Sequence, residues 1–212
     1  MDEDAQARAY SEADFAEPHD HFVELCAASI SPAVVKAGPV LDLGCGPADV
    51  TVRVARRFPQ AIVHGVDGSA AMLKYGHERV AKEKLGARIT LVQALLPRDR
   101  PPAARYPVIV SNSLLHHLHD PQALWSTVKR FGGPGARVFV MDLMRPDSAG
   151  DVDRLVETYS AGEPEVLRRD FHASLCAAFT ADEVRSQLRA AGLTKLAVNV
   201  VSDRHLTVSG AL

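Results

Sequence analysis

Short apolar runs alternate with segments of helical periodicity along most of this 212-residue chain. An apolar run of about four to eight residues that ends at a turn is typical of a buried strand. A regular alternation of strands and helices favours a parallel sheet with helices on both faces. The predicted strands of this kind are residues 39–44, 61–67, 88–94, 108–115 and 136–143.

Helices are predicted between these strands and near the C-terminus. Ser69 and Thr180 stand where N-cap residues are preferred, and Gly192 follows the last helical position of its segment. The last two apolar runs, 195–201 and 205–212, are too close together for a crossover helix, so they should pair as antiparallel strands. We therefore predict an α/β fold with a doubly wound, Rossmann-like, seven-stranded sheet, mostly parallel with a C-terminal antiparallel hairpin. The predicted helices are residues 49–58, 69–86, 121–132 and 180–193.

The length of the chain allows one sizeable core and is short for two full domains, so a single domain over residues 1–212 is predicted. Two short helices, 5–16 and 19–30, are expected before the sheet, with a break at Pro18. Ligands of doubly wound sheets bind beyond the carboxyl ends of the strands, and the N-terminal cap and the insertion should cover that edge. The predicted parts are a helical cap (1–36), a core (38–145), an insertion (146–178) and a final helix with the hairpin (179–212).

Composition and charge argue against several classes of partner. The net charge of −2 gives no general attraction to a polyanion, so we expect no nucleic-acid partner. No apolar run approaches the ~18 residues that span a bilayer, and the acidic N-terminus has no signal-peptide core, so we expect no membrane partner. The three scattered cysteines suit a reducing compartment. We expect a cytoplasmic protein, and the sequence leaves its oligomeric state open between monomer and homodimer.

The stretch VLDLGCGPADVTV turns from the first predicted strand into a helix through Gly44 and Gly46. A dinucleotide fold needs a third glycine at the place of Asp49, whose carboxylate would repel a pyrophosphate. Asp67 ends the second strand, where an acidic residue can accept both ribose hydroxyls, and Asp42 in the first strand suits a cationic ligand. These features point to S-adenosylmethionine, a ribonucleoside that carries positive charge and no phosphate.

At these residues the chain resembles the class I S-adenosylmethionine-dependent methyltransferases of the small-molecule type. VLDLGCGPADVTV is similar to their first motif, VHGVDGSAAML to their second, VIVSNSLLHHLHDP to their strand-four motif and FGGPGARVFVMDL to their strand-five segment. The resemblance covers about residues 38–145 and implies that this core binds S-adenosylmethionine and releases S-adenosylhomocysteine.

The sequence departs from that family pattern at two places. Ala48 replaces the usual third glycine of the first motif, a small change that the fold should tolerate. LVQALLP lacks the acidic residue that accepts from the adenine amino group in many relatives, so Gln93 or the neighbouring backbone is expected to replace it. The predicted cofactor-binding residues are Asp42, Gly44, Gly46, Asp67, Gly68, Met72, Gln93, Ala94, Leu95, Asn112 and, from the cap, Tyr10.

Three histidines, His116, His117 and His119, follow the fourth predicted strand, and Asp142 lies at the end of the fifth. A His116–Asp142 pair could hold one imidazole tautomer and let the other ring nitrogen take a proton from the acceptor. This arrangement resembles small-molecule O-methyltransferases. Adjacent histidines point to different sides, and no cysteine or carboxylate set has the spacing of metal ligands, so we expect no metal.

The segment after the fifth strand supplies the predicted acceptor-binding residues, Arg145, Phe171 and His172. The predicted function is transfer of a methyl group from S-adenosylmethionine to a small-molecule acceptor by in-line displacement, with His116 and Asp142 as base pair. The alternatives are a nucleic-acid methyltransferase, whose Asn/Asp-Pro-Pro-aromatic motif is missing after the fourth strand, and a non-catalytic S-adenosylmethionine-binding module. The sequence does not tell whether oxygen, nitrogen, sulfur or carbon accepts the methyl group.

Overall fold

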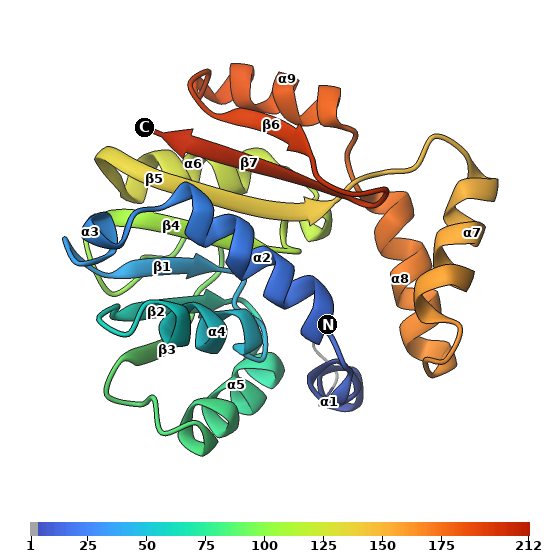
Figure 1. Cartoon of the computed structure of the whole chain (residues 1–212), viewed down its shortest axis with the longest axis horizontal. Coiled ribbons are helices and arrows are strands. Elements are labelled where there is room, and N and C mark those ends of the chain that lie inside the picture. The colour runs from blue at the N-terminus through green and yellow to red at the C-terminus, as the bar shows by residue number, and fades with distance from the viewer. Residues whose placement is uncertain (1–3) are drawn as a thin grey trace.

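The computed structural model describes residues 4–212, and a seven-stranded sheet runs through its centre with helices on both faces (Figure 1). The strand order is β3-β2-β1-β4-β5-β7-β6. Strands β1 to β5 are parallel, and β7 pairs antiparallel with both β5 and β6. The predicted fold class is therefore confirmed. The strands are β1 Val40–Leu43, β2 Val63–Asp67, β3 Ile89–Gln93, β4 Tyr106–Asn112, β5 Gly132–Leu143, β6 Ala197–Val200 and β7 His205–Ala211.

Two apolar cores cover the two faces of the sheet. One core joins it to α2, α3, α4 and α5, and the other joins it to α6 and α9. In β4, Val108 and Val110 belong to the first core and Ile109 to the second, because successive side chains of a strand point to opposite faces. The helices are α1 Asp4–Glu12, α2 Ala16–Ser29, α3 Pro32–Val35, α4 Asp49–Arg57, α5 Ala70–Lys82, α6 Gln122–Phe131, α7 Ala149–Ser160, α8 Glu165–Ala177, α9 Ala181–Ala191 and the 3₁₀ turn η1 Leu115–His117.

The N-terminal helices differ from the prediction at Pro18. Helix α2 begins at Ala16, so Pro18 lies within its first turn rather than between two helices. Proline is tolerated there because the first backbone N–H groups of a helix have no intrahelical acceptor. The expected break at Pro18 is wrong, and the chain instead turns around Asp14.

Strand β4 begins and ends earlier than the predicted range 108–115, whereas β5 is longer than predicted. β4 already begins at Tyr106, and β5 follows α6 without an intervening loop, since Gly132 is both the C-cap of α6 and the first residue of the strand. The segment 146–178 folds into α7 and α8, which extend beyond the carboxyl end of β5 (Figure 1).

The helices α7 and α8 pack on each other around a small apolar cluster of their own, which includes Leu155 and Leu175. Helix α1 contacts both α5 and α8 at the same edge of the sheet. The cap and the insertion thus both lie at the carboxyl edge. Within residues 4–212, every helix is too short or too polar to cross a bilayer.

Candidate active site

The turn after β1 adopts backbone conformations that favour glycine. Gly44 has φ +72° and Gly46 has φ +51°. A Cβ atom at Gly44 would lie 2.8 Å from Leu114, whereas at Gly46 it would meet open space. Ala48, with φ +61°, also takes the left-handed conformation and caps α4. The turn tolerates alanine at this third position although such backbone costs a non-glycine residue about 1 kcal/mol.

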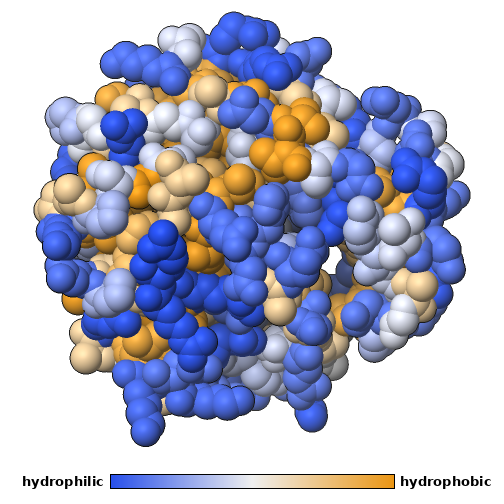
Figure 2. Space-filling model, viewed as in Figure 1, coloured by the Kyte–Doolittle hydropathy of each residue, from blue (hydrophilic) through white to orange (hydrophobic). Residues whose placement is uncertain are grey.

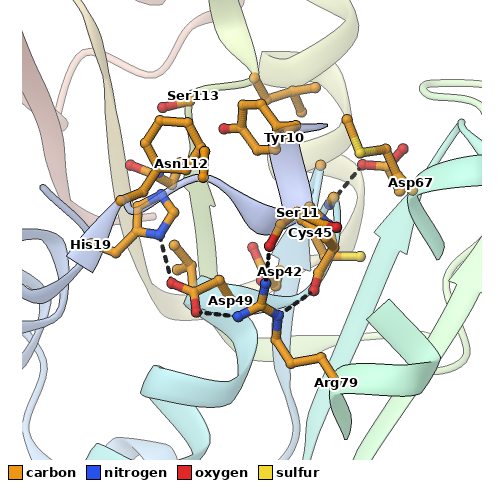
Figure 3. A pocket seen from close by; sticks show the side chains of 18 of the residues that line it. Tyr10, Ser11, His19, Asp42, Cys45, Asp49, Asp67, Arg79, Asn112 and Ser113 are labelled. Carbon is orange, nitrogen blue, oxygen red and sulfur yellow. Dashed lines mark hydrogen bonds and ion pairs between the residues drawn. The ribbon is translucent and has the colours of Figure 1, made fainter. Parts of the chain in front are cut away.

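A cavity of about 570 Å³ opens at this turn, at the carboxyl edge of β1 and β2 (Figure 3). Its walls come from the glycine turn, the end of β4, the first turn of α5 and the N-terminal cap. Seven of the predicted cofactor-binding residues line it: Tyr10, Asp42, Gly44, Gly46, Asp67, Met72 and Asn112.

Two carboxylates give the cavity a negative wall. Asp42 is 1% exposed and accepts a hydrogen bond from Thr51 Oγ1 at 2.6 Å. Burial raises the pKa of Asp42 to about 6, and the charge of Asp67 acts in the same direction against the Thr51 hydrogen bond. Asp67 accepts from the N–H groups of Gly46 and Ser69, both at 2.8 Å. A cationic group beside Asp42 would relieve its burial cost, so this wall favours a cation.

The arginines at this cavity are already paired with carboxylates. Asp49 accepts from Arg53 at 2.7 Å, from Arg79 at 2.8 Å and contacts His19 Nδ1 at 2.6 Å. Burial acts to raise the pKa of Asp49, but the hydrogen bonds from His19 and Arg53 outweigh it and hold the pKa well below its usual range. Arg79 also donates to the carbonyl oxygens of Ser11 and Pro47, and Figure 3 shows the contact with Ser11. These guanidinium groups are therefore engaged within the chain rather than presented to a pyrophosphate.

The remaining predicted cofactor residues lie beside the cavity rather than in its wall. Gln93 Nε2 donates to the Gly68 carbonyl at 3.0 Å, and the Ala94 N–H donates to the Asp67 carbonyl. Leu95 is 49% exposed and covers Gly68, where a Cβ atom would lie 2.9 Å from Leu95 Cδ2. The part of Gly68, Gln93, Ala94 and Leu95 in cofactor binding stays a prediction.

A second cavity, of about 510 Å³, adjoins the first beneath α7 and α8. Figure 2 shows this face of the molecule hollowed between the α7–α8 side and the rest. The two cavities share a wall, formed by Tyr10, Asp14, Phe15, His19, Asn112, Ser113 and His117. Adjoining cavities of this size can hold two reactants with their reacting groups close together.

The pair predicted from strand ends, His116 and Asp142, is in contact. His116 Nδ1 lies 2.6 Å from Asp142 Oδ1, and the Leu115 N–H donates to Asp142 Oδ2 at 2.7 Å. Both side chains are buried, and His116 lines the second cavity. An ionised Asp142 can only accept, so it fixes the imidazole proton on Nδ1. Nε2 makes no hydrogen bond within residues 4–212 and keeps a lone pair for the cavity.

Besides His19 in the shared wall, two more histidines line the second cavity, His117 and His205, and neither is among the predicted site residues. Burial lowers the pKa of each to about 4, so both are neutral near pH 7. His205 reaches the site because β7 pairs with β5 in a register that sets it opposite Leu143, next to Asp142. The sequence alone does not give this strand register, so His205 could not be predicted as a site residue.

Only one of the three predicted acceptor-binding residues, Phe171, lines the second cavity. Arg145 donates instead to Glu183 at 2.5 Å and to the Ala178 carbonyl at 3.2 Å. His172 is exposed, with Nε2 3.5 Å from Asp153 on α7. Arg145 and His172 do not line the second cavity, because their side chains bind partners elsewhere, on α9 and α7 respectively.

The first cavity fits a nucleoside that carries positive charge and no phosphate. Gly46 leaves open space, Asp42 and Asp67 supply negative charge, and the nearby arginines are paired. Together with the strand order, this site has the features of a class I S-adenosylmethionine-dependent methyltransferase.

Comparisons with known proteins agree with this class. Residues 40–135 match the sequence family described as a methyltransferase domain. The trans-aconitate 2-methyltransferase of Variovorax paradoxus is 31% identical over 130 residues, which are 61% of this chain and 47% of that protein. An uncharacterized methyltransferase of Mycobacterium tuberculosis is 28% identical over 155 residues, 71% of this chain and 76% of that protein. The chain spans about half, or less, of the length of the first trans-aconitate methyltransferases that it matches.

Solved structures show the same fold. A SAM-dependent methyltransferase from Aquifex aeolicus superposes with a TM-score of 0.66 over 97% of both chains, at 16% identity. With the domain match over residues 40–135 and the named relatives, these findings support a class I S-adenosylmethionine-dependent methyltransferase.

Proposed function

We propose that this protein transfers a methyl group from S-adenosylmethionine to a small-molecule acceptor by in-line displacement, with the His116–Asp142 pair as general base. The observation that carries the proposal is the 2.6 Å contact between these two buried side chains at the wall of the second cavity. That cavity adjoins the one that suits the cofactor. An acceptor in the second cavity would therefore face both the methyl donor and a proton acceptor.

Residues that line the first cavity would hold the cofactor. Asp42 and the glycine turn suit the positively charged methionine end, and Asp67 suits the ribose hydroxyls. Met72 offers an apolar contact for the adenine, and Tyr10 and Asn112 border the second cavity. When bound, S-adenosylmethionine supplies a methyl group activated by the sulfonium. We propose that no metal takes part.

His116 would act on an acceptor whose nucleophilic atom carries a proton at neutral pH. Its Nδ1 proton is fixed by Asp142, so Nε2 is the atom that takes the proton of an acceptor hydroxyl. Imidazole suits this step because its ordinary pKa lies near neutrality. Asp142 holds the ring in place through its second contact, the hydrogen bond from the Leu115 N–H.

The role of the His116–Asp142 pair as general base is tested by comparing turnover with cofactor binding in the His116→Ala variant. An acceptor screen that measures release of S-adenosylhomocysteine provides the turnover, and calorimetry provides the affinity for S-adenosylhomocysteine. We expect turnover to fall by about 10²- to 10⁴-fold with little change in affinity. His172→Ala is the matched control, because this histidine is exposed and lies outside the cavity lining. Unchanged turnover in His116→Ala would reduce that residue to a packing role.

The same measurements separate the proposed function from the two alternatives. Robust incorporation of labelled methyl groups into bulk RNA or DNA would overturn the small-molecule acceptor. Binding of S-adenosylhomocysteine without turnover of any acceptor would favour a binding module. Asp67→Ala should weaken the binding, and an unchanged affinity would contradict the ribose contact.

A further inference from the structure

The second cavity carries more negative than positive charge. Among the residues of the described chain that line it, four are carboxylates and one is a guanidinium, that of Arg204. The carboxylates are Asp14, Glu17, Glu163 and Asp170. A cavity lined mainly by one sign of charge attracts ligands of the other sign and repels those of the same sign.

Arg204 is already surrounded by partners. Its guanidinium stacks 3.3 Å from the centre of the Tyr159 ring, and its nitrogens lie 3.3 Å from Asp203 and 3.5 Å from Glu17. The Arg204 side chain is 11% exposed. An acceptor carboxylate would have to compete with two carboxylates for this cation, so Arg204 does not offset the negative wall.

The histidines of the second cavity add little positive charge near neutral pH. Burial lowers the pKa of His117 and of His205 to about 4, so both rings are neutral. His19 is held by Asp49, whose carboxylate offsets any charge on the ring. His116 is held in the same way by Asp142. The histidines therefore leave the sign of the cavity unchanged.

The side of the cavity formed by α7 and α8 supplies two partly buried carboxylates. Asp170 accepts a hydrogen bond from Gln6 Nε2 at 2.7 Å. Glu163, in the turn between the two helices, makes no side-chain hydrogen bond or ion pair with any residue in 4–212. The rest of this lining is largely apolar, with Phe15, Met141, Leu143, Leu167 and Phe171.

We propose that the second cavity selects an acceptor with an apolar body and a neutral or cationic polar end, and excludes carboxylated acceptors. This inference rests on the proposed function for the identity of the cavity as the acceptor site. It separates this chain from the relatives named for trans-aconitate, because a tricarboxylate would meet four carboxylates and a paired arginine.

Three phenols of similar size test the charge preference. Tyramine carries an ammonium, 4-ethylphenol has no charge, and 4-hydroxyphenylacetate carries a carboxylate. Their affinities are measured by calorimetry and ligand-observed NMR, with and without S-adenosylhomocysteine, at low ionic strength. We expect tyramine to bind at least about fivefold more tightly than 4-hydroxyphenylacetate, with the ratio shrinking as salt is added. Trans-aconitate should not displace tyramine.

A charge reversal at Glu163 tests whether the preference for tyramine comes from the wall of the second cavity. In Glu163→Lys the preference for tyramine should fall by about threefold or more, because an unpaired carboxylate becomes an ammonium. Glu165→Lys changes the net charge by the same amount at an exposed position outside the lining, and it should keep the preference. Equal losses in both variants would assign the effect to the overall charge and overturn the proposal.

The remaining outcomes are also decisive. If 4-hydroxyphenylacetate or trans-aconitate binds as tightly as tyramine, the acceptor class is wrong. If no phenol binds while S-adenosylhomocysteine does, the acceptor class is again wrong and the proposed methyl donor stands. If tyramine is preferred but S-adenosylhomocysteine does not bind, the charge selection holds and the proposed function fails.

Discussion

The buried carboxylate of Asp42 couples ligand binding in the first cavity to pH. Burial raises the pKa of Asp42 to about 6, so this group in the free protein takes up a proton as the pH falls through that value. A bound ammonium group nearby favours the ionised carboxylate. Below pH 6, binding must therefore expel a proton from Asp42, whereas above pH 6 it need not.

We accordingly predict that the affinity for S-adenosylhomocysteine falls as the pH drops below about 6. The loss should approach roughly tenfold per pH unit where Asp42 is protonated in the free protein only. Calorimetry from pH 5 to 7.5, in buffers of different ionisation enthalpy, gives both the affinity and the number of protons released. Asp42→Asn should bind more weakly at pH 7 and lose this pH dependence. A flat profile for the unaltered protein would contradict the role of Asp42.

Among the structural elements, helix α1 of the N-terminal cap is fastened to the first cavity by Arg79 of α5. Arg79 donates to the Ser11 carbonyl on α1, to the Pro47 carbonyl in the glycine turn and to Asp49 on α4. Three separate segments thus meet at a single guanidinium (Figure 3). Opening the cap must break the bond to Ser11, so Arg79 should slow the exchange of ligand in the cavity.

The Arg79→Met variant should release S-adenosylhomocysteine about tenfold faster, since it loses the charge-assisted hydrogen bond to α1. Surface plasmon resonance measures this dissociation rate. Arg53→Met is the matched control, because Arg53 also pairs with Asp49 but bonds to Asp20 on α2 rather than to Ser11 on α1. Similar rates in the two variants would show that pairing with Asp49, and not the contact with α1, governs release.

Helix ends are predictable from sequence because their signals are local. Thr180 accepts from the Glu183 N–H and Glu183 accepts in return from the Thr180 N–H, which completes a capping box. Gly192 takes the left-handed conformation at the end of the same helix, and Ser69 caps α5 by accepting from the Met72 N–H. Each signal lies within a few residues of the end that it marks.

The wall of the second cavity is less predictable because distant segments form it. The register of β7 on β5 places His205 in this wall. The packing of α7 against α8 places Glu163 there. Arg145 shows the reverse case, since the nearby start of α9 offers Glu183 as a partner and turns the side chain away. By contrast, His116 and Asp142 are predictable as neighbours, because adjacent parallel strands end at the same edge of the sheet.

At the scale of the whole molecule, the described chain is divided between the sheet with its two cores and the pair α7–α8. The apolar contacts of α7 and α8 belong mainly to a small separate cluster, around Leu155 and Leu175. Helix α9 is also peripheral, but Trp125 Nε1 donates to Gln187 at 3.0 Å and ties it to α6 within the second core. Elements with few contacts to the main core open at a lower free energy than the core itself.

We therefore predict that native-state hydrogen exchange separates these two units. The amides of α7 and α8 should exchange faster than those of β1, β4 and β5 by at least about tenfold, because α7 and α8 can open without unfolding the sheet. Helix α9 is the internal control and should exchange with the sheet. S-adenosylhomocysteine should slow exchange in α1 and the glycine turn, since these line the first cavity. Equal protection of α7, α8 and the central strands would mean that these elements unfold as one unit, and the second cavity would then have no independently opening wall.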